Sequence, residues 1–111
     1  MRFLMLVLSD STADPEEEAP FPIGDWADEA YGSGRATTGD RLRPAEEAKT
    51  IRNRGGVVTV EDGPASRSLG RIEGFDVLEC ESIDDAVELA TRHPMATGGA
   101  IQLHPAWPLD L

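Results

Sequence analysis

Two histidines, two aspartates and one arginine are the side chains of this sequence best placed to do chemistry. His93 precedes Pro94 at the expected end of a helix. As an imidazolium it would stabilise the negative end of that helix. As a group that titrates near neutral pH it would instead act as a general acid or base in a pocket. The sequence leaves both roles open.

Two aspartates are the candidate catalytic partners of His93. Asp62 opens an Asp62-Gly63-Pro64 turn, where its carboxylate either caps backbone N–H groups or faces a ligand. Asp76 interrupts an apolar segment, and a carboxylate there must pair, stay solvated or shift its pKa upward. We therefore expect Asp76 at an open strand end, in a salt bridge across a dimer, or in a ligand site.

Arg41 and His104 are the candidate substrate-binding residues. The Arg41 guanidinium could hold a carboxylate through two hydrogen bonds, but an internal salt bridge is the simpler expectation in a chain with 21 acids. His104 shares a polar strand face with Gln102, which favours an interface histidine over a metal ligand. The sequence has no phosphate loop, dinucleotide-binding glycine pattern, nucleophile elbow or metal motif, so we expect no cofactor and no metal.

The first segment of the chain predicts the sheet that must position these residues. Residues 2–9 are apolar on both alternating faces, which predicts a strand covered on both sides. In a chain of 111 residues, helices can cover one face of a sheet. A second copy of the chain is the natural cover for the other face, so we expect a homodimer.

Helical and strand patterns alternate along the rest of the chain. We expect helices at 23–33 and 82–92, strands at 37–43, 48–52, 57–61, 72–80 and 100–104, and loops at 10–22 and 65–71. This order predicts a single α+β domain over residues 1–111, a ferredoxin-like sandwich with an inserted β-hairpin.

Short local signals fix several of these boundaries. Arg54-Gly55-Gly56 predicts the hairpin turn. Ser82 followed by Asp85 resembles a capping box at the start of the second helix. Cys80 has no neighbouring base and is interpreted as a small buried hydrophobe, and Trp107 and Leu109 are candidate packing anchors in the tail.

Composition limits the classes of partner. The net charge of −11 repels nucleic acid and anionic membranes. One cysteine excludes an internal disulfide and a cysteine-based zinc cage. The apolar run at the start is too short to span a bilayer and precedes no cleavage site, so we expect a cytoplasmic protein.

Several motifs resemble one known family. These are Asp62-Gly63-Pro64, Gly74-Phe75, Ser82-Ile83-Asp84-Asp85-Ala86, Pro94-Met95-Ala96 and Gly98-Gly99. Their spacing, from the first strand to His104, is similar to that of the YCII-related proteins, in the branch with a DGPF motif. The resemblance implies a dimeric α+β barrel, in which two ferredoxin-like sheets pack face to face.

The sequence departs from that family at chemically important positions. The Phe of the DGPF motif is Ala65 here, and the polar segment after it reads Arg67, Ser68, Leu69, Gly70. Better-known members have a His on the first helix and an Asp just before the proline after the second helix. Here the first helix holds no His, and the Asp position is His93.

Three functions are compatible with these features. The first is a cofactor-independent enzyme of the lyase or isomerase type, with a pocket near the dimer interface, since proton transfer is what these side chains offer. The alternative is a non-catalytic ligand-binding or regulatory module, because proteins of the DGPF branch are similar to ones often encoded beside alternative sigma factors. The third is a dimeric scaffold with a vestigial pocket.

Overall fold

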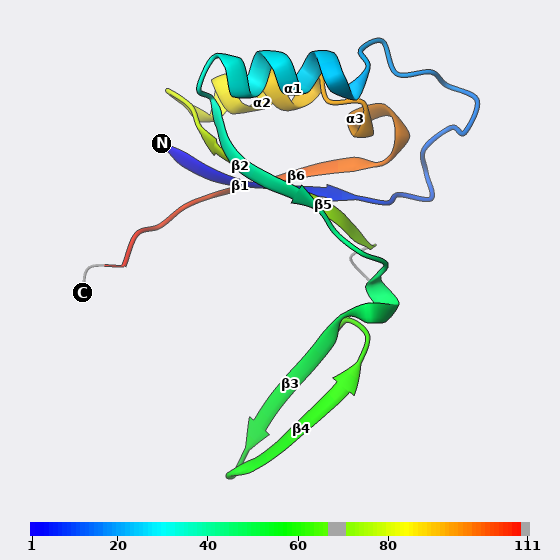
Figure 1. Ribbon diagram of the computed structural model, residues 1–111, viewed down its shortest axis with the longest axis vertical. Coiled ribbons are helices and arrows are strands. Elements are labelled where there is room, and N and C mark those ends of the chain that lie inside the picture. Colours follow the sequence, from blue (N-terminus) through cyan, green and yellow to red (C-terminus); the bar gives the residue numbers. More distant parts are fainter. Residues whose placement is uncertain (67–70, 110–111) are drawn as a thin grey trace.

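A four-stranded antiparallel sheet with helices on one face forms the body of the protein (Figure 1). A computed structural model describes residues 1–66 and 71–109. The strand order is β2-β5-β1-β6, as in a ferredoxin-like sandwich, which confirms the expected fold class. The body consists of β1 (Arg2–Leu8), α1 (Ile23–Gly32), β2 (Ala36–Arg41), β5 (Ile72–Glu79), α2 (Ile83–Thr91), α3 (Met95–Gly98) and β6 (Ala100–Pro105).

Strand β1 lies in the interior of the sheet, between β5 and β6. Its Phe3 and Met5 side chains are fully buried beneath the helices. Leu4 points to the opposite face, pairs with Val77 of β5 and is 41% exposed. Within the described chain, helices therefore cover one face of this strand, and the second apolar face has no cover from secondary structure.

The hydrophobic core lies between the helices and the covered face of the sheet. Alternation along each strand sends every second side chain into this core. Its buried members are Phe3, Met5, Val7, Trp26, Ala30, Ala36, Leu78, Cys80, Ala86, Leu89 and Ala90. Cys80 is buried among them, as the sequence predicts.

The inserted hairpin projects away from the body, on the side of the sheet opposite the helices (Figure 1). It consists of β3 (Lys49–Arg54) and β4 (Val57–Asp62), which form a separate two-stranded sheet. Gly55 and Gly56 join them with φ of 57° and 82°, the left-handed pair that a tight two-residue turn requires. The predicted hairpin and its turn are confirmed.

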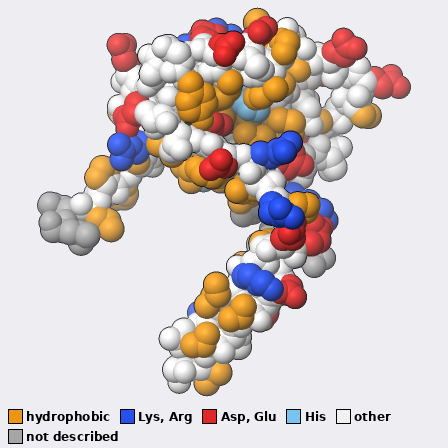
Figure 2. Space-filling model, viewed as in Figure 1, with side chains coloured by type: hydrophobic (Ala, Val, Ile, Leu, Met, Phe, Trp, Pro, Cys, Tyr) orange, Lys and Arg blue, Asp and Glu red, His pale blue; other side chains and the backbone are white. Residues whose placement is uncertain are grey.

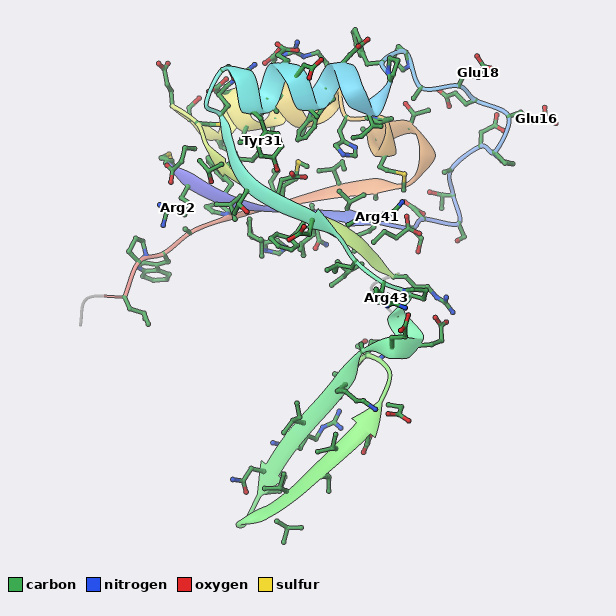
Figure 3. All side chains as sticks on the ribbon, in the orientation of Figure 1. Arg2, Glu16, Glu18, Tyr31, Arg41 and Arg43 are labelled. Atoms are coloured by element: carbon green, nitrogen blue, oxygen red, sulfur yellow. The ribbon has the colours of Figure 1, made fainter. Side chains whose placement is uncertain are left out.

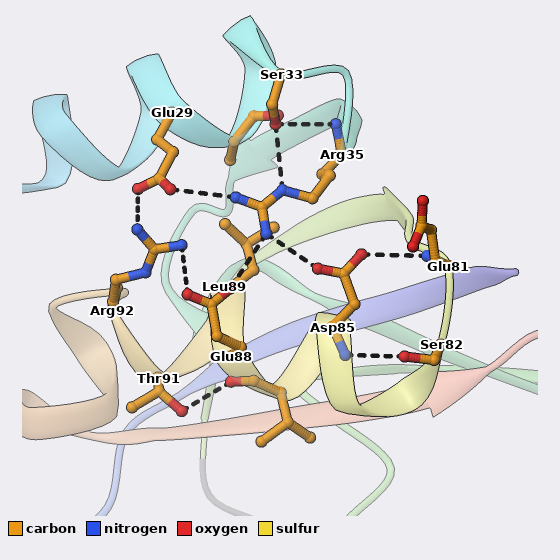
Figure 4. Close-up of polar contacts among 12 residues, drawn as sticks. Glu29, Ser33, Arg35, Glu81, Ser82, Asp85, Glu88, Leu89, Thr91 and Arg92 are labelled. Atoms are coloured by element: carbon orange, nitrogen blue, oxygen red, sulfur yellow. Dashed lines mark hydrogen bonds and ion pairs between the residues drawn. The ribbon is translucent and has the colours of Figure 1, made fainter.

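Caps and ion pairs fix the helices on the sheet. The Ser82 hydroxyl accepts a hydrogen bond from the Asp85 backbone N–H at 3.1 Å, which confirms the predicted cap of α2. Arg35, just before β2, pairs with Glu29 of α1 and with Asp85 and Glu88 of α2 (Figure 4). This one guanidinium thereby joins both long helices to the start of β2.

The structure differs from the sequence expectations in its shortest elements and in its tail. The four-residue helix α3 and the 3₁₀ turn η1 (Ala45–Glu47) were not predicted. Trp107 and Leu109 are 94% and 81% exposed, so they do not anchor the tail on this chain. Residues 67–70 of the expected polar loop lie outside the described residues. No helix in the described part of the chain is long and apolar enough to span a membrane.

Candidate functional site

A pocket of about 500 Å³ opens between the helices and the ends of β2 and β5. This volume suits a small organic molecule. Figure 2 shows a histidine at a hollow beneath the helix layer, surrounded by hydrophobic side chains. The ionisable residues that line the pocket are Tyr31, Asp40, Arg41, Glu73, Asp76 and His93, and its apolar walls include Val7, Ile23, Trp26, Ala27, Phe75 and Met95.

His93 is buried at the C-terminal end of α2, with 6% of its surface exposed. Its Nδ1 accepts a hydrogen bond from the Met95 backbone N–H at 3.0 Å. Burial lowers the pKa of this imidazole to about 4. The ring is therefore neutral at physiological pH, so it does not stabilise the helix end as a cation. Because Nδ1 is the acceptor, the ring proton is on Nε2, and His93 can offer an N–H to a ligand.

Trp26 fixes the orientation of the His93 ring. The two rings meet edge to face, with centroids 4.7 Å apart and planes inclined by 68°. The Trp26 indole N–H donates to the Leu89 carbonyl at 2.8 Å, which ties α1 to α2. The indole thus holds both the helix pair and the imidazole, and it presents an apolar surface to the pocket.

Asp76 lies on the helix-covered face of β5 and is hydrogen-bonded by Tyr31 of α1. The Tyr31 hydroxyl donates to Asp76 Oδ1. Burial raises the pKa of the Asp76 carboxyl, and the hydrogen bond from Tyr31 acts against that rise. Burial and the neighbouring Asp76 raise the pKa of Tyr31, so the phenol stays protonated and remains the donor. The structure places Asp76 at a pocket within one chain, and its role in binding a ligand stays a prediction.

Gly39 of β2 leaves the space that this pair occupies. A Cβ at Gly39 would lie 2.3 Å from Asp76 Oδ1, 2.5 Å from the Phe75 carbonyl oxygen and 2.7 Å from the Tyr31 hydroxyl. Real Cβ atoms do not approach other atoms this closely. A glycine is therefore required where β2 passes the Tyr31–Asp76 hydrogen bond.

Arg41 brings the positive charge of the pocket. It ends β2 and lines the pocket, and Figure 3 shows it at the far end of that strand from the end near Tyr31. Arg41 forms no ion pair with any described residue, unlike Arg43, which pairs with Glu47. The expected internal salt bridge of Arg41 is thus not formed within residues 1–66 and 71–109.

Two of the candidate residues lie away from this pocket. Asp62 ends β4 and pairs with Lys49 at the base of the hairpin, beside a separate hollow near Ser9 and Arg71. His104 is exposed on the uncovered face of the sheet, where its Nε2 lies 3.0 Å from Gln102 Oε1. The structure therefore brings together His93, Asp76 and Arg41, and it separates Asp62 and His104 from them.

Tyr31 and Gly39 are pocket residues that the sequence did not single out. Tyr31 fits the apolar stripe of α1, and nothing in its spacing shows that its hydroxyl reaches β5. The pairing of β2 with β5 sets Gly39 opposite Asp76, and this pairing is seen only in the structure. In the described part of the chain, no group of three His, Cys, Asp or Glu side chains is arranged to hold a metal ion.

Comparison with known proteins supports the resemblance read from the motifs. A family model described as the YCII-related domain matches residues 1–110. An uncharacterised protein of Rhizobium meliloti (strain 1021) is 36% identical over 50 residues, which are 45% of this chain. The matched segment covers 40% of that relative's length.

Proposed function

The chain belongs to the YCII-related family, and from that premise we propose that it is a cofactor-independent enzyme acting on a small organic anion. The reaction class is proton abstraction and return, as in a lyase or an isomerase. The observation that supports this proposal is the meeting of Arg41, Asp76 and His93 in one mostly apolar pocket. A cation, a carboxylate of raised pKa and a neutral N–H donor are the parts that such chemistry needs.

Arg41 is the anchor for the anionic end of the substrate. Its guanidinium has no ion-pair partner in the described chain. It lines a mostly apolar cavity, whose other charged residues are the acids Asp40, Glu73 and Asp76. A planar carboxylate can accept two parallel hydrogen bonds from this group. The apolar walls would then hold the rest of the molecule and exclude water around it.

Asp76 and His93 divide the proton chemistry between them. Asp76 is the base, because burial raises its pKa toward the range in which a carboxylate takes a proton efficiently. His93 is a hydrogen-bond donor through Nε2–H, because its Nδ1 is occupied by Met95. As Asp76 removes a proton from carbon, the electron pair moves toward a carbonyl oxygen that accepts from His93.

The proposal includes a homodimer, in which the uncovered sheet faces of two copies of the chain pack together. Leu4 and Leu6 of β1 pair with Val77 and Phe75 of β5 on the sheet face that the helices do not cover. Packing two such faces together would remove this apolar surface from water, as in the dimeric α+β barrel that the resemblance implies. In such a dimer the pocket of each protomer would lie between its helices and the ends of β2 and β5, next to the two packed sheets.

The test is a titration of the ¹⁵N-labelled protein in D₂O with small 2-oxo, 2-hydroxy and unsaturated carboxylates. NMR follows the amide shifts of the protein and the replacement of substrate C–H by C–D. We expect saturable binding and deuterium incorporation by at least one class. Wild-type protein that shows neither would refute the proposal.

Arg41 at the end of β2 and Arg43, two residues further on, provide a matched pair of variants. Arg41→Gln is expected to weaken binding by about tenfold or more, because a charged hydrogen bond to the anion is lost. Arg43→Gln removes the same charge from a residue that pairs with Glu47. This variant is expected to bind the anion with the affinity of the wild type. Equal affinities for the two variants would show that Arg41 does not hold the anion.

Ligand binding without turnover is the second candidate function. It is favoured by the first helix, which holds no histidine, unlike that of better-known members, and carries Trp26 in its apolar stripe. In the same titration this function gives saturable amide shifts with no deuterium incorporation. Asp76→Asn separates the two candidates further, since it is expected to retain binding while it abolishes exchange in an enzyme.

A further inference from the structure

We propose that the hairpin of residues 49–62, called the arm below, packs its apolar face against a second copy of this chain. The inference rests on the homodimer proposed above and adds to it a specific contact outside the sheet. It assigns a role to an element that contributes nothing to the pocket of its own chain.

The two faces of the arm differ in character. The strand register places Ile51 opposite Val60 and Asn53 opposite Val58, so these side chains share one face. Ile51, Val58 and Val60 are 65%, 59% and 62% exposed. The other face is mostly polar and bears Thr50, Arg52, Arg54, Thr59 and Glu61, with Val57 beside the turn as its apolar residue. Alternation of this kind is typical of a hairpin with one face packed against another surface.

No surface formed by residues 1–66 and 71–109 supplies that packing. The arm forms its own two-stranded sheet, and its base is closed by a hydrogen bond from the Gly63 N–H to the Ala48 carbonyl. Thr50 Oγ1 donates to the Gly63 carbonyl at 2.7 Å in the same place. An isolated hairpin is marginally stable in water, so this arm needs a cover from outside the chain.

The surface area of the chain points to a second copy as that cover. The solvent-accessible area is 7947 Å². A compact monomer of this mass exposes about 6,000 Å². The excess of roughly 2,000 Å² per chain falls within what each partner of an obligate homodimer buries. The radius of gyration of 16.0 Å likewise exceeds the value of about 13 Å for a compact domain of this length.

Charge also favours a second copy. Three of the ten cationic residues lie in the arm, against two of the 21 acidic ones, so the rest of the chain carries a strong negative charge. Lys49 and Arg52 pair with Asp62 and Glu61 inside the arm, but Arg54 near its tip has no ion pair with a described residue. The register places Arg54 on the polar face with Arg52, so the acidic body of a second copy complements the net positive charge of the arm as a whole and not its apolar face.

Neighbouring residues on the two faces of β4 give the test. Val60→Asp places a carboxylate on the apolar face, and Thr59→Asp adds the same charge on the opposite face. Light scattering with size exclusion gives the mass over a range of concentrations, and hydrogen exchange gives the protection of the arm amides. We expect Val60→Asp to raise the dimer dissociation constant by about 100-fold or more, and Thr59→Asp to change it little.

The outcomes separate the arm from the dimer. A wild-type dimer whose arm amides are protected, and lose protection in Val60→Asp, supports the inference. A dimer that Val60→Asp leaves intact, with arm amides unprotected throughout, overturns it while the dimer of the sheets stands. A wild-type chain of 12.0 kDa at all concentrations overturns both.

Discussion

Lowering the pH from 7 to 4 is expected to destabilise this protein through His93. The imidazole is buried, and its pKa falls to about 4 from an ordinary value of 6.5. Below pH 6.5 the imidazole of the unfolded chain binds a proton, whereas the imidazole of the folded chain stays neutral until the pH falls to about 4. The unfolded state therefore binds more protons in this window, and the free energy of unfolding falls as the pH falls.

The size of the effect follows from the fall in pKa. A difference between 6.5 and about 4 corresponds to about 3 kcal/mol of unfolding free energy. Solvent screens this effect little, because 6% of the residue is exposed. With a urea m-value of about 1.5 kcal/mol/M for a chain of this length, the urea midpoint falls by about 2 M. The loss is absent above pH 6.5 and complete below about pH 4.

The assay is urea unfolding at fixed protein concentration from pH 7 to pH 4, for wild type and for His93→Gln. The Gln side chain stays neutral at every pH and can accept the Met95 N–H, so its midpoint is expected to vary less in this window. His104→Gln is the control, since His104 is exposed. Glu29 and Asp85, whose pKa values lie below their ordinary range, affect stability at still lower pH.

Two results would contradict this reasoning. One is a pH dependence between 6.5 and 4 that is the same in wild type and in His93→Gln. The other is an NMR titration of the His93 ring with a midpoint near 6.5, which would mean that the ring is solvated in the folded protein. Either result would also remove the neutral Nε2–H donor from the proposed chemistry.

Two further variants probe the contact between β2 and the Tyr31–Asp76 pair. Gly39→Ala is expected to lower the free energy of unfolding by about 1–3 kcal/mol through overpacking. The control is Gly24→Ala, where a Cβ meets nothing within 4 Å, and its effect on stability is expected to be neutral or slightly stabilising. Equal unfolding curves for the two variants would refute the clash at Gly39. Asp76→Asn is expected to raise the urea midpoint at pH 7 while it abolishes the replacement of substrate C–H by C–D. Burial raises the folded-state pKa of Asp76, so its contribution to stability falls as the pH rises through that pKa. A lower midpoint for Asp76→Asn would contradict this sign.

Local sequence signals were enough to predict most of the fold. The apolar β1, the Gly55-Gly56 turn and the Ser82 cap each depend on a few adjacent residues, and each is observed. Helix α3 and turn η1 were missed because three or four residues carry no periodicity. Trp107 is a candidate packing anchor by sequence, but no surface of the described chain lies against it.

The site was predictable only in part, because it depends on tertiary contacts. His93 and Asp76 are predicted from residue type, and the packing of the helix layer on the sheet brings them to one pocket. Asp62 was chosen in the same way, but the hairpin carries it away from the body. The neutral state of His93 follows from burial beside Trp26, which the sequence does not reveal.

The most direct test of the proposed site is the NMR signal of the His93 Nε2–H proton during titration with the carboxylate panel. A bound anion in the pocket of Arg41 and Asp76 would accept a hydrogen bond from this group. We predict a saturable downfield shift of the His93 signal, with no change at His104 on the uncovered sheet face. Binding that leaves the His93 signal unchanged would place the ligand elsewhere and contradict the account.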